Sequence, residues 1–337
     1  MKIAVDAMGG DFAPREIVQG ALQAVHEYGT QVILVGDTEK ITAELGSSRD
    51  KIELVHAKEV IAMDEHPASS VRKKKDSSIV KANLLVKEGE AQAVVSAGST
   101  GAAMAASLLY LGRIKGIDRP AIASVLPTLK GGTVLLDIGA NVDCKPQYLL
   151  QFAIMGNLYA SKILGIKKPR IGLLNIGEEE TKGNELTLAA FPLLQQSGIN
   201  FIGNVEGREV FGGNVDVIVC DGFIGNIVLK TSEGLATNLK NMIKQEISRS
   251  VPAKLGILLT LPSLKRLRRR IDHTEYGGAP LLGINGISVI SHGSSTAKAI
   301  KNAIRVAADA VENRLVSAIK ADIEKGQNTK GVAGSAE

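Results

Sequence analysis

Polar residues set among glycines recur along the 337-residue chain, each time after an apolar run. The loops read DAMGGD, SAGSTG, DIGANVD, NIGEEETKGNE, DGFIGN and SHGSS. Glycine lets a backbone approach a ligand closely, because it has no side chain in the way. Ordinary turns also favour glycine, but the recurrence predicts a shared floor on which a ligand is bound.

The loop at the start of residues 96–112 has the composition of an anion site. Gly98 and Gly101 leave room, while Ser99, Thr100 and the first helical N–H groups can hold an anion. A helix N-terminus contributes about half a positive charge and free donors. The alternative interpretation is a tight turn with an N-cap.

Three further loops carry side chains suited to acyl or phosphoryl chemistry. In residues 175–185, Lys182 follows three glutamates, and a lysine anchored near carboxylates can position a phosphate. Asn141 and Asn226 can each donate an amide N–H to an oxyanion. The alternatives are a solvated surface loop around Lys182 and Asx turns for Asp143 and Asp221.

The sequence lacks the motifs of several enzyme classes. It has no G-x-G-x-x-G, no G-x-x-x-x-G-K-[ST], no G-x-S-x-G and no H-E-x-x-H. The five histidines show no ligand spacing, and His292, in SHGSS, is more typical of a structural residue. Cys144 and Cys220 are too few for a disulfide framework or a zinc site. We therefore expect inert thiols, no metal and no cofactor.

The apolar runs predict the elements that position these loops. Continuous rather than alternating apolar character indicates strands buried on both faces, and helices between them indicate a mostly parallel sheet. Ligands of such sheets collect beyond the carboxyl ends of the strands. The segment 146–165 is apolar nearly all round, so it is either a core helix or a subunit interface. The expected strands are 2–10, 31–37, 51–57, 91–101, 132–143, 170–180, 199–207, 215–226 and 287–295, with helices at 14–28 and 297–324.

The segment 253–273 differs from the rest of the chain. An uncharged LGILLTL precedes a helix-like stretch with apolar and arginine-rich faces, which suits an anionic membrane surface. A lid packed on the core and a docking site for an acidic protein are the alternatives. The predicted membrane- or partner-binding residues are Leu255, Leu258, Leu259, Leu261, Leu264, Lys265, Arg266, Leu267, Arg268, Arg269 and Arg270.

The charge balance supports this interpretation. Lys plus Arg exceed Asp plus Glu by 40 − 35 = 5, and residues 265–270 alone carry five positive charges. Only 3% of residues are aromatic, which is poor for stacking on nucleic-acid bases. No apolar run reaches the roughly 18 residues of a membrane span, and Asp6 comes too early for a secretory signal. We expect a soluble cytoplasmic protein that binds no nucleic acid.

A second basic run, residues 72–75, is more typical of a solvated face, although it is also suited to a contact with substrate phosphate.

Taken together and in this order, the loops resemble those of the PlsX-type phosphate acyltransferases of bacterial phospholipid synthesis. The resemblance spans residues 5 to about 310, and two positions depart from it, because the family more usually has Asn at Ser99 and Thr at Ile224. The matching strings are DAMGGDFAP, RKKKDSS, VVSAGSTGA, LLDIGANVDCKPQYLLQFAIMG, GLLNIGEEETKGNE, CDGFIGNIVLKTSEG and GGAPLLGINGISVISHGSS.

The resemblance implies a three-layer α/β/α sandwich related to isopropylmalate dehydrogenases and phosphotransacetylases, and a homodimer. It also implies the reaction: a long-chain acyl group moves from acyl carrier protein to inorganic phosphate. The acyl phosphate then passes to a membrane glycerol-3-phosphate acyltransferase. We expect one catalytic domain at 1–324, composed of one or two lobes, and a disordered tail at 325–337. The protein would associate reversibly with the inner face of the cell membrane.

The residue chemistry fits such a reaction, because phosphate is itself the nucleophile. We hypothesise that Lys182 positions phosphate and that Asn226 helps to hold the oxyanion. The predicted phosphate- and substrate-binding residues are Asp6, Gly9, Gly10, Ser96, Gly98, Ser99, Thr100, Gly101, Asn141, Asn184, Asp221, Gly222, Gly225 and His292.

Three other functions remain open from the sequence. They are a phosphotransacetylase that uses acyl-CoA, a nicotinamide-dependent decarboxylating dehydrogenase, and a non-catalytic module that binds a membrane surface. The dehydrogenase shares the architecture but would need a metal–carboxylate signature that the sequence lacks.

Overall fold

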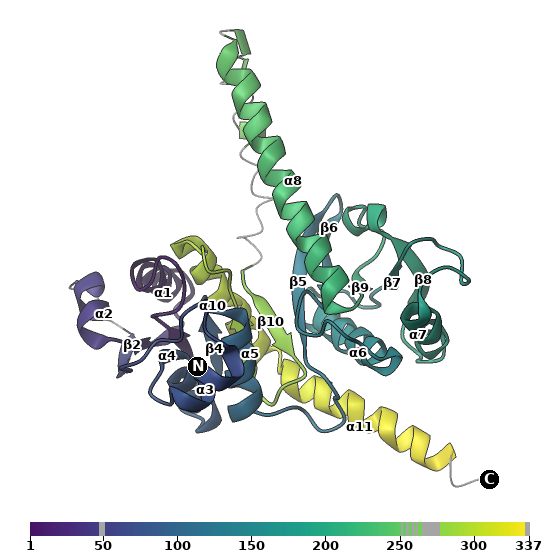
Figure 1. The fold of residues 1–337 in the computed structure, drawn as a ribbon, viewed down its shortest axis with the longest axis horizontal. Coiled ribbons are helices and arrows are strands. Elements are labelled where there is room, and N and C mark those ends of the chain that lie inside the picture. The colour runs from purple at the N-terminus through teal and green to yellow at the C-terminus, as the bar shows by residue number, and fades with distance from the viewer. Residues whose placement is uncertain are drawn as a thin grey trace.

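The fold is a single continuous sheet covered by helices (Figure 1). The computed structural model describes residues 1–46, 51–250, 252–253, 256–257, 260, 262–264 and 277–333, with side chains up to residue 325. The eleven strands are ordered β3-β2-β1-β4-β11-β10-β5-β6-β9-β7-β8. Their bounds are β1 Lys2–Asp6, β2 Gln31–Gly36, β3 Ile52–His56, β4 Ala93–Ser96, β5 Ala121–Thr128, β6 Gly131–Leu136, β7 Ile171–Asn175, β8 Phe201–Glu206, β9 Val217–Val219, β10 Ala279–Leu282 and β11 Ile287–Ile290.

Helices lie on both sides of the sheet and give the molecule its two lobes (Figure 1). They are α1 Arg15–Tyr28, α2 Thr38–Leu45, α3 Pro67–Lys73, α4 Ser78–Lys87, α5 Thr100–Tyr110, α6 Pro146–Lys162, α7 Glu185–Gln195, α8 Gly222–Arg249, α10 Ala297–Glu312 and α11 Leu315–Ala333, with a 3₁₀ helix at Gly207–Phe211. The predicted α/β fold with a mostly parallel sheet is confirmed.

The sheet reverses direction between the lobes. β3, β2, β1, β4 and β11 are mutually parallel, as are β6, β9, β7 and β8. Three antiparallel pairings, β11 with β10, β10 with β5, and β5 with β6, separate these groups. The strand direction therefore reverses between the two groups, through β5 and β10, which the sequence interpretation lacked. The shared floor stays a prediction, because the twist of about 20–25° per strand accumulates across the sheet and also sets where the strand ends lie.

The core is built on both faces of the sheet. In β1, Ile3 and Val5 pack in one apolar cluster and Ala4 in another, because alternate residues of a strand face opposite ways. α6 packs in the first cluster, where Phe152 and Tyr159 are buried, and burial raises the pKa of the Tyr159 phenol. Of the two alternatives for residues 146–165, the structure supports the core helix.

The predicted helix at 297–324 is two helices. α10 ends at Glu312, and Arg314 adopts a left-handed conformation with φ 50° before α11 begins. α11 is anchored by buried Leu315, Ile319 and Ile323 and runs to Ala333, past the point where a disordered tail was expected. A helix that has been nucleated extends at little further cost.

The outer part of α8 projects from the body (Figure 1). Leu235 and Met242, on this part of α8, are 68% and 62% exposed.

Leu264, in the predicted membrane-facing segment, is 39% exposed. None of the helices in the described part of the chain has the length and apolar content needed to cross a membrane. The other predicted membrane- or partner-binding residues, Leu255, Leu258, Leu259, Leu261, Lys265, Arg266, Leu267, Arg268, Arg269 and Arg270, lie outside the described residues.

Candidate active site

The structure gathers the predicted site residues into two groups. The first loop cluster comprises residues 6–11, 96–101 and 291–295, which follow β1, β4 and β11. Ser96 Oγ donates to Asp6 Oδ2 at 2.7 Å, and the Gly98 N–H donates to Ser96 Oγ at 3.1 Å. The Asp11 N–H donates to the Gly293 carbonyl at 2.8 Å. These contacts hold the three loops together.

The side chain of Asp6 joins these loops through hydrogen bonds. Its side chain is buried, and burial raises its pKa, although hydrogen bonds from the Ser78 and Ser96 hydroxyls oppose the shift. A Cβ on Gly9 would lie 2.6 Å from Asp6 Oδ2 and 2.7 Å from the Gly98 nitrogen. Glycine at position 9 thus lets its loop pack closely against the loop that contains Gly98. Ser96, whose hydroxyl both donates and accepts, has the same structural role.

The N-terminus of α5 retains free donors. Ser99 Oγ accepts the Ala102 N–H at 3.5 Å, a long cap. Among the described residues, no hydrogen-bond partner is recorded for the Thr100 or Gly101 N–H. Ser99 can therefore cap α5 while the N–H groups of Thr100 and Gly101 are left to bind an anion. His292 accepts the Ser294 N–H on Nδ1 within its own turn, which is a structural contact.

The second loop cluster comprises residues 137–141, 175–184 and 220–226, which follow β6, β7 and β9. β9 lies between β6 and β7, with Val219 aligned with Leu136 on one side and Leu173 on the other. Arg170 fixes this register through its N–H and Nε, which donate to Asp216 Oδ2 at 2.7 and 2.9 Å. Although burial opposes it, Arg170 lowers the pKa of Asp216.

Asn141, which the sequence predicted as an oxyanion donor, uses its side-chain amide within the protein. Its amide nitrogen donates to the Pro120 carbonyl at 2.7 Å and to Asp137 Oδ2 at 2.8 Å, so both amide hydrogens are engaged. Asp221 Oδ1 accepts the Ile224 N–H at 2.8 Å and caps α8, which confirms the capping alternative. Gly222 packs against the loop, since a Cβ there would lie 2.9 Å from Asp137 Oδ2.

Lys182 lies on a loop that hydrogen bonds of its backbone hold in place. Its N–H donates to the Glu179 carbonyl at 3.1 Å, and its carbonyl accepts Asn175 Nδ2 at 3.0 Å. A Cβ on Gly177 would lie 2.9 Å from Lys182 Cγ, so the side-chain stem crosses that glycine. No ion pair of Nζ with a described residue is recorded. Asn184 is engaged as the N-cap of α7 and accepts the Thr187 N–H at 3.0 Å.

Asn226 is the amide that remains available in this cluster. It lies on the first turns of α8, where its side chain is exposed and close to Gly139. Phe223 and Ile227, on the same turns, are 55% and 47% exposed. No hydrogen bond of its amide to a described residue is recorded. Lys182 and Asn226 thus follow neighbouring strands at the same edge of the sheet.

The two thiols are unsuited to nucleophilic catalysis. Burial raises the pKa of Cys220 well above its usual value and that of Cys144 to about 12. Both remain protonated at neutral pH, and the thiolate is the reactive form. In the described part of the chain, no three His, Cys, Asp or Glu side chains gather as metal ligands would.

Sequence reasoning missed Asp137, the most heavily bonded carboxylate of the second loop cluster. The signal was present, because Asp137 follows the apolar run TVLL as Asp6 follows IAV. A carboxylate that directly extends a buried strand must be hydrogen-bonded to be tolerated. Ser78, which bonds Asp6, was missed as well.

α5 connects the two clusters. It begins in the first loop cluster. Its residues Met104 and Leu108 pack against a group of buried apolar side chains, and Ile138 and Ala140, from the second loop cluster, pack against the same group. Among the described residues, no hydrogen bond or ion pair joins one loop cluster directly to the other.

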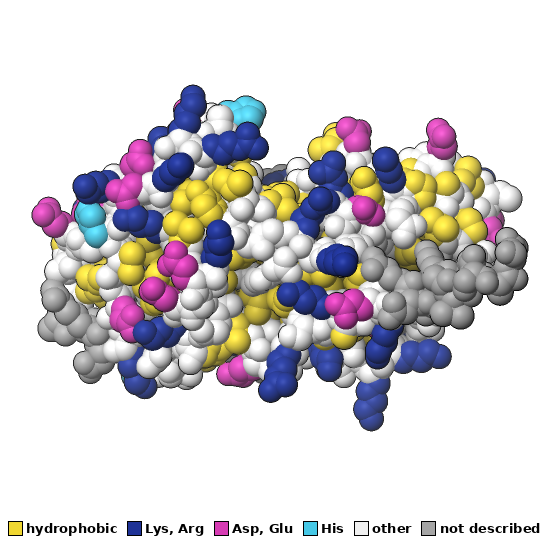
Figure 2. Space-filling view, turned by 90° about the horizontal axis from the view of Figure 1, so that it is seen from below, with side chains coloured by type: hydrophobic (Ala, Val, Ile, Leu, Met, Phe, Trp, Pro, Cys, Tyr) yellow, Lys and Arg dark blue, Asp and Glu magenta, His cyan; other side chains and the backbone are white. Residues whose placement is uncertain are grey.

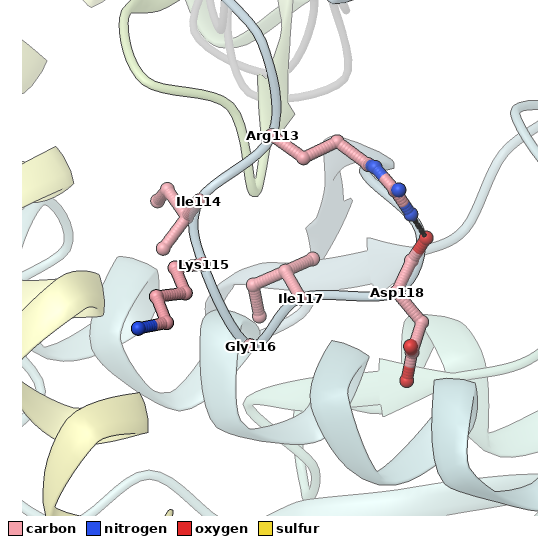
Figure 3. Close-up of a pocket in the computed structure, with 6 residues that line it drawn as sticks. All are labelled: Arg113, Ile114, Lys115, Gly116, Ile117 and Asp118. Carbon is pink, nitrogen blue, oxygen red and sulfur yellow. Dashed lines mark hydrogen bonds between the residues drawn. The ribbon is translucent and has the colours of Figure 1, made fainter.

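A cavity of about 430 Å³ lies elsewhere, inside the loop 113–118 (Figure 3). The Arg113 guanidinium closes the loop onto the Asp118 carbonyl, as Figure 3 shows. Gln151 of α6 fastens it further, with Nε2 donating to Asp118 Oδ2 at 2.8 Å. None of the predicted site residues lines this cavity.

The fold is an α/β architecture of the phosphotransacetylase type. A phosphotransacetylase from Streptococcus pyogenes superposes with a TM-score of 0.64, covering 93% of this chain and 94% of its own, at 18% identity. At that identity the likeness shows the fold alone.

The sequence relatives define the family. A family model described as "Fatty acid synthesis protein" matches residues 1–318. A protein named phosphate acyltransferase in Pelotomaculum thermopropionicum is 65% identical over 99% of this chain and 98% of its own. One with the same name in Desulfitobacterium hafniense is 61% identical over 96% and 98%. The chain belongs to the PlsX-type phosphate acyltransferase family and is an acyltransferase.

Proposed function

We propose that the protein transfers a long-chain fatty acyl group from acyl carrier protein to inorganic phosphate. A phosphate oxygen attacks the thioester carbonyl carbon, the C–S bond breaks, and the thiolate takes up a proton. The product is an acyl phosphate, which a membrane acyltransferase uses to acylate glycerol 3-phosphate. Two proteins named phosphate acyltransferase are 65% and 61% identical to this chain over nearly its whole length, which supports phosphate as the acyl acceptor.

The side chains of the second loop cluster support direct attack by phosphate without a covalent acyl-enzyme intermediate. In the second loop cluster, Lys182 and Asn226 follow the neighbouring strands β7 and β9, and neither side chain has a recorded hydrogen bond or ion pair to a described residue, while the thiol of Cys220 stays protonated. Phosphate is a nucleophile near neutral pH, and the leaving thiol has a pKa of about 8.5, so a strong general acid is dispensable. Lys182 holds the phosphate in line, and Asn226 donates to the tetrahedral oxyanion.

In this proposal the first loop cluster binds substrate through the N–H groups at the start of α5, for which no partner among the described residues is recorded. Thr100 and Gly101 supply donors at the positive end of a helix, which favours an anionic group of a substrate. Asp6, Ser96, Gly9 and Gly98 support this helix by fixing the loop that leads into it.

The acyl-CoA alternative is tested by offering both thioesters. With inorganic phosphate present, the palmitoyl thioester of acyl carrier protein should be consumed and acyl phosphate formed. Turnover of acyl-CoA alone would instead assign the chain to the phosphotransacetylase type, which the shared fold also accommodates.

We further propose a homodimer that acts at the cytoplasmic face of an anionic membrane. The projecting half of α8 supports the dimer, since Leu235, Leu239, Met242 and Ile243 are all more than half exposed there. A solution mass of one chain would contradict it. The composition of residues 253–273 supports the membrane contact, in which each basic residue contributes about 1 kcal/mol.

Replacing Leu258 and Leu259 with glutamate should abolish co-sedimentation with anionic liposomes, because it puts two negative charges into the uncharged run LGILLTL. Turnover of soluble substrate should be spared, since neither residue is placed in either loop cluster. Unchanged sedimentation would instead favour the lid or the docking site for an acidic protein.

A further inference from the structure

Asp137 receives an unusual number of hydrogen bonds for one side chain. It follows β6, its side chain is fully buried, and both carboxylate oxygens accept N–H groups. Burial raises its pKa, and these donors oppose that shift because they favour the charged form. Oδ1 accepts the N–H groups of Ile122, Gly139 and Ala140 at 3.1, 3.3 and 3.0 Å, and Oδ2 accepts the N–H and the side-chain amide of Asn141 at 2.7 and 2.8 Å.

These bonds give the loop 138–141 one fixed shape. Gly139 has a φ of 137°, and three successive N–H groups of the loop converge on one carboxylate. Asn141 is fastened at its other end to the Pro120 carbonyl. A loop held at so many points has little freedom to shift, because any displacement would take hydrogen bonds away from the buried carboxylate of Asp137.

The first turns of α8 rest directly on this loop. The Gly222 N–H donates to the Asn141 carbonyl at 2.7 Å. A Cβ on Gly225 would overlap the carbonyl oxygen of Asp137, so the helix backbone lies against that peptide. Asn226 follows at once, and its side chain lies near Gly139.

We propose that Asp137 is a positioning residue: by holding the loop 138–141 as the seat of α8, its carboxylate fixes the amide of Asn226 for transition-state stabilisation. The inference rests on the role of Asn226 given under the proposed function. Asp137 touches no substrate and acts only through Asn226. A donor displaced by about 1 Å can cost about a hundredfold in rate.

A double-mutant cycle tests this coupling. Asp137→Asn turns one acceptor oxygen into a donor that faces N–H groups, so it should lower kcat about 10- to 100-fold with KM little changed. Asn226→Ala should lower kcat by itself. If Asp137 acts through Asn226, the double variant should be no slower than Asn226→Ala, whereas independent residues would multiply their effects.

Thr133→Val is the matched control for lost stability. Thr133 is also on β6, is fully buried, and donates to the Val215 carbonyl at 2.7 Å, away from the loop. It should lower the melting temperature and leave kcat unchanged. If Asp137→Asn does not fold, Asn141→Ala replaces it, since this removes only the amide bonds to Asp137 and Pro120.

The outcomes are distinct. Multiplied effects in the double variant, or a wild-type kcat for a folded Asp137→Asn or Asn141→Ala, would overturn the positioning role while leaving Asn226 catalytic. A wild-type kcat for Asn226→Ala would overturn both. Formation of acyl phosphate by the unmodified enzyme, measured first, separates either result from a failure of the proposed reaction.

Discussion

Lys182→Ala should lower the rate of acyl phosphate formation about 100- to 1,000-fold. Its ammonium group is a strongly hydrated point charge with no recorded ion-pair partner among the described residues, although glutamates precede it in the loop. Under the proposed mechanism, removing it leaves the dianionic nucleophile without a counter-charge at the position of attack. Initial rates at varied phosphate concentration measure the effect on kcat and on the KM for phosphate.

Lys167→Ala is the matched control, because Lys167 is exposed and precedes the amino end of β7 while Lys182 follows its carboxyl end. It should retain wild-type rates. Lys182→Arg keeps the charge with a different donor geometry and should fall between the two. Near-normal turnover by a folded Lys182→Ala variant would refute the assignment.

Asn226→Ala should lower kcat by a similar 100- to 1,000-fold, or about 2.7–4 kcal/mol of transition-state stabilisation. Under the proposed mechanism, the amide donates to an oxygen that becomes negative only in the transition state, so the KM for the acyl donor should change little. Asn226→Asp, which keeps the size of the side chain but replaces the donor with a negative charge, should be at least as slow. Steady-state kinetics with varied thioester separates kcat from KM.

Asn238→Ala provides the control on the same helix. Asn238 is exposed and lies about three turns farther out along α8. Its removal should leave turnover unchanged. A large rise in KM with an unaltered kcat for Asn226→Ala would mean that the amide binds substrate in the ground state and does not stabilise the oxyanion.

The strands that the sequence predicted are those with uninterrupted apolar character. β5 and β10 were missed because Pro127 lies within β5 and Pro280 within β10, and proline argues against a strand interior. Their omission mattered for the topology, since the antiparallel pairings of these two strands separate the two parallel groups of the sheet. Periodicity reports burial of a run but not the direction in which it is paired.

The sequence shows the residue types of the candidate site, but it does not show which of their side chains are engaged in hydrogen bonds within the protein. Asn141 and Asn226 look equivalent in the sequence, each beside a glycine after a strand. Only the fold shows that the side-chain amide of Asn141 donates to Pro120 and Asp137, whereas the amide of Asn226 has no recorded hydrogen bond to a described residue. Hydrogen bonds between residues far apart in the chain cannot be read from local spacing.

The most direct test of the account is to incubate the protein with inorganic phosphate and palmitoyl acyl carrier protein and to detect acyl phosphate. We predict that acyl phosphate appears, that its formation requires phosphate, and that Lys182→Ala nearly abolishes it. Loss of the thioester without acyl phosphate, or turnover confined to acyl-CoA, would contradict the account.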